Sequence, residues 1–394
     1  MFEFTASIDD LKKALSVVAL ATTEAAEDIH AQALFRYPKQ REPVGKLYLS
    51  STDEDRIALS QLLVTDVKTS DDLASNEIEF TADPQRLQAL ISNSDLKMIR
   101  FVYDPKTLTL NAYASENSDA FISFASFDPT EFLSFEKSID AAINVTVFNT
   151  EIFLSAIRFV QGFLPNDDKE KRFSNMFFDH GKIYGTNGSY KLAAFQCEDF
   201  SGLSNLAIRR SMLGPIVSML DRVKSSSLKL KTSDSIVVVT SADNAYSFGF
   251  RRSTINMPKM PIQTTRPTAQ GFTIEPATLI KKLNRLAVAS KEDVGLRLSM
   301  KEDGNELLIE TETERRSREK ITCQRISGSD SIEIFNHCSK IKSVIEPFTA
   351  ASVEVYLDKN TIIYSESEFI VKEDGIETKK PFIAVGLLAA AKRV

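Results

Sequence analysis

The sequence predicts an α+β protein built from three similar domains, each made of two strand-helix-hairpin units. Two observations lead to this prediction. A strand followed by an amphipathic helix recurs three times at a spacing of about 130 residues, and a second strand, helix and hairpin follow about 70 residues into each copy. The chain of 394 residues is also long enough for two to four domains of ordinary size. Short polar turns between the strands favour antiparallel sheets.

The first unit of each copy begins with Phe4-Thr5, Val145-Thr146 or Phe272-Thr273. Apolar residues follow at offsets of 7, 11 and 14, the spacing of one face of a helix. These helix positions are Leu11, Leu15 and Val18; Ile152, Ala156 and Phe159; and Leu279, Leu283 and Leu286. Ser7 and Asn149 suit the start of the first two helices, and Pro276 suits the first turn of the third.

The second unit of each copy is again a strand, a helix and an alternating hairpin. The strands that begin these units are predicted at 78–80, 207–208 and 332–334. The hairpins that end them have polar turns at 104–106, 232–234 and 358–360. Chance periodicity in an unrelated α+β protein is the alternative, but order, offsets and turns agree in all three copies.

Domain boundaries are predicted near Asp140 and in the proline-containing segment Pro258 to Gly271, where regular structure is disfavoured. The expected domains are therefore 1–141, 142–267 and 268–394.

Composition excludes several classes of protein. The net charge is −6, which argues against a uniformly basic nucleic-acid binder, and no apolar run approaches the ~20 residues of a spanning helix. The first residues do not resemble a secretory signal peptide. Cys197, Cys323 and Cys338 are widely spaced and odd in number, so neither a disulfide framework nor a zinc site is predicted. No cofactor is expected.

Four short segments, taken in order along the repeats, resemble the β subunit of bacterial DNA polymerase III, the sliding clamp. They are Thr52-Asp53-Glu54-Asp55, the stretch Gly185 to Ala193, Phe335-Asn336, and Pro381 to Val385. No single segment is specific, but their order and spacing cover the whole chain. Departures from the family pattern are Lys191 in place of an arginine, one extra residue between Thr186 and Leu192, and a different ending from Val385 onward.

The resemblance implies a head-to-tail homodimeric ring with helices lining the hole and sheets outside. Such a ring encircles double-stranded DNA without sequence specificity and tethers a DNA polymerase and other partners, with a clamp loader that supplies any ATP hydrolysis. It implies no enzyme activity and no membrane partner. The expected location is the bacterial cytoplasm, or that of an infected host if a phage encodes the chain. The departures above would suit a phage clamp.

The distribution of charge along the chain fits a ring around DNA better than the net charge of −6 does. The six predicted helical segments together carry +6, so the remainder carries −12. Basic residues on helices are also common on ordinary solvated faces, and that alternative stays open. The expected DNA-contacting residues are Lys169, Lys171, Arg172, Arg209, Arg210, Lys281, Lys282 and Arg285.

The resemblance also implies a partner-peptide groove between the second and third domains. Carried over residue by residue, it comprises Phe173, Thr186, Gly188, Leu192, Pro258, Asn336, Val385, Gly386 and Leu387. Ring closure would bring Phe121 and Ile122 of one chain to Val288 and Ala289 of the other. For each of these residues, simple core packing is the alternative.

Two other functions remain open at this point. The first is a DNA-associated adaptor built from the same domains without a ring. The second is a metal-dependent hydrolase that uses Asp53, Glu54 and Asp55 or Asp167 and Asp168, although the chain has no phosphate loop, nucleophile elbow or HExxH motif.

Overall fold

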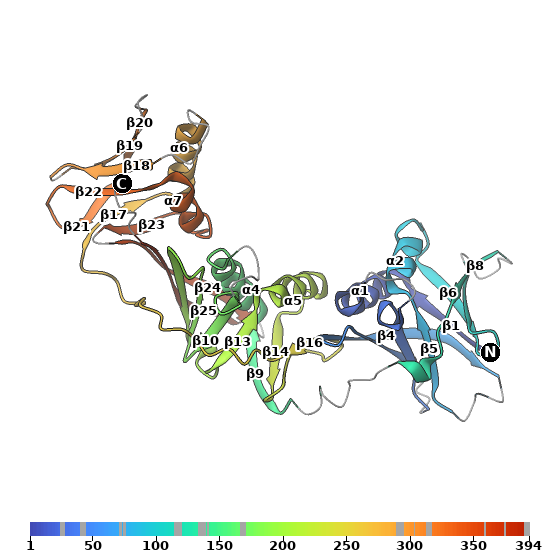
Figure 1. Cartoon of the computed structure of the whole chain (residues 1–394). Coiled ribbons are helices and arrows are strands. Elements are labelled where there is room, and N and C mark those ends of the chain that lie inside the picture. The colour runs from blue at the N-terminus through green and yellow to red at the C-terminus, as the bar shows by residue number, and fades with distance from the viewer. Residues whose placement is uncertain are drawn as a thin grey trace. The chain divides into compact units, whose positions relative to one another are not determined.

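The computed structural model describes residues 1–23, 28–39, 45–70, 73, 76–113, 120–132, 139, 142–165, 171–288, 295–302, 304–312, 317–357, 360–373 and 376–389. Figure 1 shows the chain and the element labels used below. The described chain forms two compact units by its internal contacts. Unit 1 comprises Met1–Thr150 and Gly214–Arg252, and unit 2 comprises Glu151–Leu213 and Ser253–Val394.

A strand, a helix and at least three further strands recur along the chain. The first copy is β1 (Phe2–Ser7), α1 (Ile8–Val18), β2 (Ala33–Tyr37), β3 (Gly45–Thr52) and β4 (Arg56–Thr69), then β5 (Ile78–Ala82), α2 (Pro84–Ser92), β6 (Met98–Asp104), β7 (Thr109–Tyr113) and β8 (Phe121–Ala125). The predicted α+β pattern is confirmed, but each hairpin gains a third strand that its alternation did not reveal.

The middle copy has the same order of elements. It consists of β9 (Asn144–Asn149), α4 (Thr150–Gln161), β10 (Asn175–Asp179), β11 (Lys182–Thr186) and β12 (Lys191–Cys197), then β13 (Leu206–Arg209), α5 (Arg210–Val223), β14 (Ser227–Thr232), β15 (Ile236–Ser241) and β16 (Tyr246–Arg251).

The last copy adds one short strand. It consists of β17 (Gln270–Ile274), α6 (Pro276–Val288), β18 (Gly295–Met300), β19 (Glu306–Thr311), β20 (Arg318–Thr322) and β21 (Gln324–Ser327), then β22 (Ile332–His337), α7 (Cys338–Ile345), β23 (Val353–Leu357), β24 (Asn360–Glu373) and β25 (Ile376–Ala389). None of the helices in the described ranges is long and apolar enough to cross a membrane.

Local chemistry fixes where several helices begin. The Ser7 hydroxyl accepts a hydrogen bond from the amide of Asp10 at 3.5 Å, as expected of a cap. The Asp83 carboxylate accepts from the amides of Gln85 and Arg86, with Pro84 at the first helical position. Pro276 is likewise the first residue of α6.

The described strands pair antiparallel, and the same pairing rule holds in each copy. The first strand pairs with the strand after the second helix, as β1–β6, β9–β14 and β17–β23. The strand that begins the second half pairs with the strand after the first helix, as β5–β2, β13–β10 and β22–β18. In each copy, therefore, the first strand of each half lies in the sheet formed by the later strands of the other half, and these two pairings join the halves.

Consecutive copies share sheets. In unit 1, β4 of the first copy pairs with β16 of the middle copy, which places both in one sheet of order β8-β7-β6-β1-β4-β16-β15-β14-β9. In unit 2, β12 of the middle copy pairs with β25 of the last, in a sheet of order β13-β10-β11-β12-β25-β24-β23-β17-β21. A third sheet has the order β20-β19-β18-β22. Because the middle copy contributes to both units, the two units do not coincide with the three predicted domains, whose boundaries stay a prediction.

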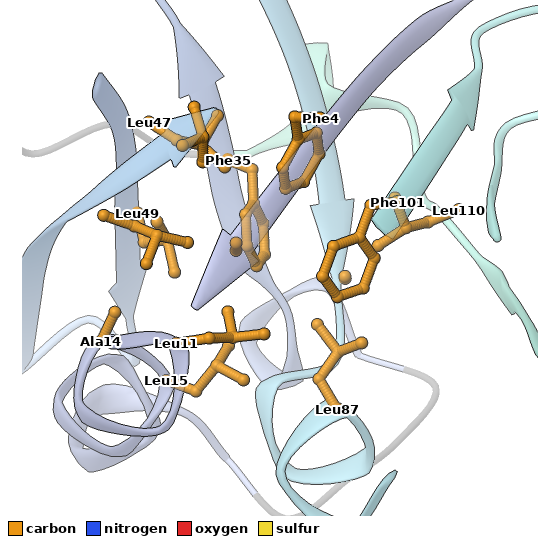
Figure 2. Packing of buried hydrophobic residues seen from close by; sticks show 14 of the residues in the cluster. Phe4, Leu11, Ala14, Leu15, Phe35, Leu47, Leu49, Leu87, Phe101 and Leu110 are labelled. Atoms are coloured by element: carbon orange, nitrogen blue, oxygen red, sulfur yellow. The ribbon is translucent and has the colours of Figure 1, made fainter. Parts of the chain in front are cut away.

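The core of the first copy shows how the helix pattern is used. Phe4 of β1, Phe35 of β2 and Phe101 of β6 point toward Leu11 and Leu15 of α1 and Leu87 of α2 (Figure 2). Each of these side chains is at most 2% exposed. The two helices pack against each other over this core. The predicted apolar helix face is therefore the buried face.

Candidate functional sites

A groove of about 540 Å³ lies in unit 2, where the β11–β12 turn, the segment 258–261 and the end of β25 meet. Six of the nine predicted groove residues line it: Phe173, Thr186, Gly188, Leu192, Pro258 and Leu387. Leu192 and Leu387 are partners across the β12–β25 pair. Apolar residues alternate with nearly as many polar or charged ones in the lining, so the groove offers both apolar contacts and hydrogen-bonding groups to a peptide.

Side-chain hydrogen bonds hold the turn at the rim of this groove. The Asn187 carboxamide oxygen accepts from the amides of Ser189, Tyr190 and Lys191 at 3.1–3.2 Å. The Thr186 hydroxyl donates to the carbonyl of Lys191 at 2.8 Å and accepts from the amide of Gly188 at 3.0 Å. These five hydrogen bonds hold the backbone of the turn.

Gly188 is required by this turn for two reasons. Its φ of +71° lies in the left-handed region, where a side chain is strained. Its α-carbon also packs so closely against the ring of Phe173 that no β-carbon would fit. The ring of Phe173 is therefore positioned by the absence of a side chain at Gly188.

Three predicted groove residues do not line the groove. Val385 is 0% exposed and belongs to the same buried cluster as Leu192. A side chain at Gly386 would point toward the rings of Phe163 and Phe348, away from the groove, because alternate residues of a strand face opposite sides of the sheet. Asn336 is also 0% exposed, but its Nδ2 donates to the carbonyl of Ala389 at 3.1 Å, and Ala389 does line the groove. Asn336 therefore positions the end of β25.

The groove contains residues that sequence reasoning placed elsewhere or did not consider. Arg172, predicted to contact DNA, lines the groove with its guanidinium carbon 5.9 Å from the centre of the Phe173 ring. The others are Ser189, Tyr190, Lys191, Lys259, Met260, Pro261, Asn360 and Ala389. In the segment Met257 to Pro261 the sequence predicts only Pro258 as a groove residue, whereas Lys259, Met260 and Pro261 line the groove as well.

Lys191 lines the groove but directs its ammonium group inward. Its Nζ donates to the carbonyl of Gly162 near the end of α4 at 2.7 Å. Burial lowers the pKa of Lys191, and the neighbouring charge of Arg210 lowers that pKa further, while Glu346 opposes both. The lysine at this position thus acts as a hydrogen-bonded support for the groove.

Two predicted DNA-contacting residues meet in a second cavity of unit 2. Lys171 and Arg209 line a space of about 400 Å³ together with Ser174, Asn175, Ser211 and residues 253–255. Arg210, the first residue of α5, instead donates from Nη1 to the carbonyl of Pro165 at 2.6 Å. Lys169 lies outside the described residues.

The basic residues of α6 do not share one environment. Lys282 and Arg285 both pair with the Glu319 carboxylate on β20, with Nζ–Oε2 and Nε–Oε1 distances of 2.7 and 3.2 Å. No ion pair of Lys281 is found in the part of the chain that the structure describes. Glu319 therefore offsets part of the positive charge that the sequence assigns to this helix.

Comparison with known proteins gives a result for structure only. No family model and no curated protein matches the sequence. Among solved structures, the DNA polymerase III β subunit of Pseudomonas aeruginosa superimposes with a TM-score of 0.76 at 13% identity, over 99% of this chain and 100% of that one. The Bacillus subtilis DNA polymerase sliding clamp gives 0.76 at 13% identity, over 100% of both chains. The chain has the sliding-clamp fold.

A third structure with the clamp fold includes a bound peptide. It is the Helicobacter pylori β clamp with a DNA ligase peptide, which superimposes with a TM-score of 0.70 at 14% identity over 99% of this chain and 100% of that chain.

The predicted dimer residues are exposed within the clamp fold. Phe121 and Ile122 of β8 are 53% and 52% exposed, and Val288 at the end of α6 is 88% exposed. Ala289 lies outside the described residues. Among described strands, β8 pairs only with β7, and β20 pairs only with β19.

Two of the acidic residues considered for a metal site, Asp53 and Asp55, are paired with arginines. The Asp53 carboxylate accepts from the amide and Nε of Arg56 at 2.8 and 2.6 Å, and Asp55 lies 3.5 Å from Arg251. In the described ranges, no three metal-ligating side chains gather. Asp167 and Asp168 lie outside those ranges.

Proposed function

We propose that this protein is a DNA sliding clamp: a head-to-tail homodimeric ring of three-domain chains, divided at 1–141, 142–267 and 268–394. It encircles duplex DNA without sequence specificity and tethers a polymerase and other partners. The observation that carries this proposal is the way consecutive copies join. Each joint pairs the last strand of a first half with the last strand of the next copy's second half, as in β4–β16 and β12–β25.

The same rule predicts how the ring closes. In the described part of the chain, two strands near these positions have no such partner: β8, the last strand of the second half of the first copy, and β20, which in the first half of the last copy is followed only by the short β21. Pairing β8 of one chain with β20 of another repeats the joint between different chains. Two chains joined head to tail close after two such contacts.

A ring of this kind holds DNA by topology and by weak phosphate contacts. Lys171, Arg209 and Lys281 are the first candidates, because no ion pair or side-chain hydrogen bond of theirs is found among the described residues, whereas Lys282 and Arg285 share Glu319, Arg210 donates to the Pro165 carbonyl and Arg172 lines the groove. Lys169, Arg172 and Arg210 are secondary candidates. A net charge of −6 limits adhesion to phosphate, which suits sliding rather than tight binding.

The test of the ring uses the topology of DNA. Protein loaded on nicked circular DNA should stay bound through gel filtration and should dissociate when the circle is cut by a restriction enzyme. Retention that survives linearisation would favour the adaptor without a ring. Magnesium-dependent cleavage of DNA, abolished by Asp53→Ala, would favour the hydrolase.

The groove would hold apolar peptides of the polymerase, of the clamp loader and of other partners. We infer that Phe173, Leu192 and Leu387 form the apolar contacts and that Thr186, Gly188 and Pro258 shape the rim. Titration of a consensus clamp-binding peptide tests this placement. Leu192→Ala should weaken binding, and tight binding unaffected by that change would refute it. The proposed tether performs no chemistry, so opening of the ring would depend on a loader.

A further inference from the structure

The lining of the groove in unit 2 is positively charged. Of the 15 described residues that line it, Arg172, Lys191 and Lys259 are cations and none carries a carboxylate. The chain as a whole has 48 lysines and arginines against 54 aspartates and glutamates, which gives a net charge of −6. The groove therefore has the opposite sign of charge to the chain that contains it.

One of the three cations is used inside the protein. Lys191 donates through Nζ to the carbonyl of Gly162 at 2.7 Å, so its ammonium group supports the wall. Burial lowers the pKa of Lys191, and the charge of Arg210 lowers that pKa further. Glu346 opposes both effects, but its carboxylate lies 3.4 Å from Lys342 Nζ. Around Lys191, the neighbouring cation therefore has a larger effect than the neighbouring carboxylate.

The other cations of the groove are held without carboxylate partners. The guanidinium carbon of Arg172 lies 5.9 Å from the centre of the Phe173 ring, and no ion pair of Arg172 or Lys259 is found among the described residues. Lys340 of α7 places its Nζ 5.3 Å from the centre of the ring of Tyr190, which lines the groove. An aromatic face attracts a cation without neutralising its charge. These charges therefore stay available to a ligand.

The surroundings of these cations favour a peptide over DNA. Leu192 and Leu387 lie in the same lining, and they gain from covering by apolar side chains, which a sugar-phosphate backbone does not supply. Lys259 stands between Pro258 and Met260 on one wall, so a charge and apolar contacts follow each other along it. A ligand that matches this lining combines apolar groups with carboxylates.

We propose that the groove selects partner segments in which acidic residues flank the apolar ones, with carboxylates placed at Arg172 and Lys259. This inference rests on the proposed peptide-binding function of the groove and adds the chemical class of the partner. The apolar side chains supply most of the affinity, and the carboxylates supply selectivity and faster association. Arg172 and Lys259 are both exposed, so each contact has the strength of a surface ion pair and is screened by salt.

The probe is a consensus clamp-binding peptide extended on each side by glutamates, by serines or by lysines. Fluorescence anisotropy with the full chain measures its binding. At about 0.1 M salt the glutamate form should bind about tenfold more tightly than the serine form, since each of the two contacts contributes about threefold. The lysine form should bind most weakly. At about 1 M salt the three affinities should agree within about twofold, because the Debye length falls to about 3 Å.

Variants of the two cations test their role directly. R172Q/K259Q keeps two polar side chains but removes both charges. It should lower the affinity for the glutamate peptide to that for the serine peptide and leave the affinity for the serine peptide unchanged. The matched change K13Q/K301Q removes two exposed cations outside the groove and should preserve the preference for the glutamate form.

Three results would overturn the proposal. The first is equal affinity of the three peptides at low salt, and the second is a preference for the glutamate form that survives in R172Q/K259Q. The third is a loss of retention on nicked circular DNA in R172Q/K259Q with the order of the peptides unchanged, which would assign these cations to DNA. All three results leave the groove in place. Failure of every form of the peptide to bind would instead refute the peptide groove of the proposed function.

Discussion

Gly188, whose φ is left-handed, packs its α-carbon against the ring of Phe173, and both residues line the groove. The contact is possible only because Gly188 has no side chain. It therefore links a conformational requirement of the β11–β12 turn to the position of an aromatic ring in the proposed peptide site.

We expect G188A to displace Phe173 and to weaken binding of a consensus clamp-binding peptide by about tenfold or more. The reason is both steric overlap and a left-handed backbone that costs alanine about 1 kcal/mol. Isothermal titration calorimetry measures the affinity. G214A is the matched control, because Gly214 in α5 has no neighbouring atom within 4 Å of an added β-carbon. Equal affinity of G188A and the native chain would argue that Phe173 lies outside the peptide site.

The exposed edge strand β8 gives the second prediction. F121D/I122D should convert a dimer to a monomer in sedimentation experiments, since carboxylates replace two apolar side chains that are more than half exposed in the single chain. Retention on nicked circular DNA should be lost as well. L63D places a carboxylate at an exposed leucine elsewhere, on β4, and should leave the dimer intact. A dimer that persists in F121D/I122D would contradict closure through β8.

Glu319 gives the third prediction, since it pairs with both Lys282 and Arg285. E319Q should strengthen DNA binding and steepen the dependence of log K on log salt by about one unit, because the released cations become available to phosphates. K281A should make that dependence shallower by about one unit. E306Q removes a more exposed pair with Lys320 on the same sheet and serves as the control. An unchanged slope in both E319Q and K281A would place α6 away from DNA.

Tyr356 predicts how stability responds to alkaline pH. Burial raises the pKa of Tyr356 above its usual value of 10.0, and the hydrogen bond to the Glu354 carboxylate, at 2.7 Å, raises that pKa further. The unfolded chain loses this proton first, so the contribution of Tyr356 is complete below pH 10 and is lost as the pH rises above it. Urea unfolding between pH 9 and 11 should show a decline of up to about 1.4 kcal/mol per pH unit from this group. Y356F should make the decline shallower, and identical slopes in the two proteins would contradict this assignment.

Several features of the site could be predicted from the sequence because they depend on local chemistry. Thr186, Gly188 and Leu192 belong to one turn and its following strand, and a run of nine residues was enough to place them together. Val385 and Gly386 were misplaced because the sequence does not say how deep a strand lies or which face of it meets the groove. Asn336 was predicted to line the groove. Its side-chain amide is buried and reaches the groove only indirectly, by donating a hydrogen bond to the carbonyl of Ala389, which does line it.

The charge pattern shows a similar division. The sequence correctly placed Lys281, Lys282 and Arg285 on one helix, α6. Only the packed structure shows that Glu319, 34 residues beyond Arg285, pairs with two of these three cations. Ion pairs between elements depend on how strands and helices meet, which periodicity along one helix does not record.

The sequence by itself determined the repeated strand-helix units and the buried face of each helix, because apolar residues must leave water wherever the helix packs. Tertiary structure alone decided which strand edges meet, as in β4–β16 and β12–β25, and which have no second partner among the described strands, as in β8 and β20. The physical reason is that strands pair through backbone amides and carbonyls, which every residue except proline presents alike. Side-chain patterns therefore predict which face of a strand is buried, whereas the partner at its edge depends on where neighbouring strands end.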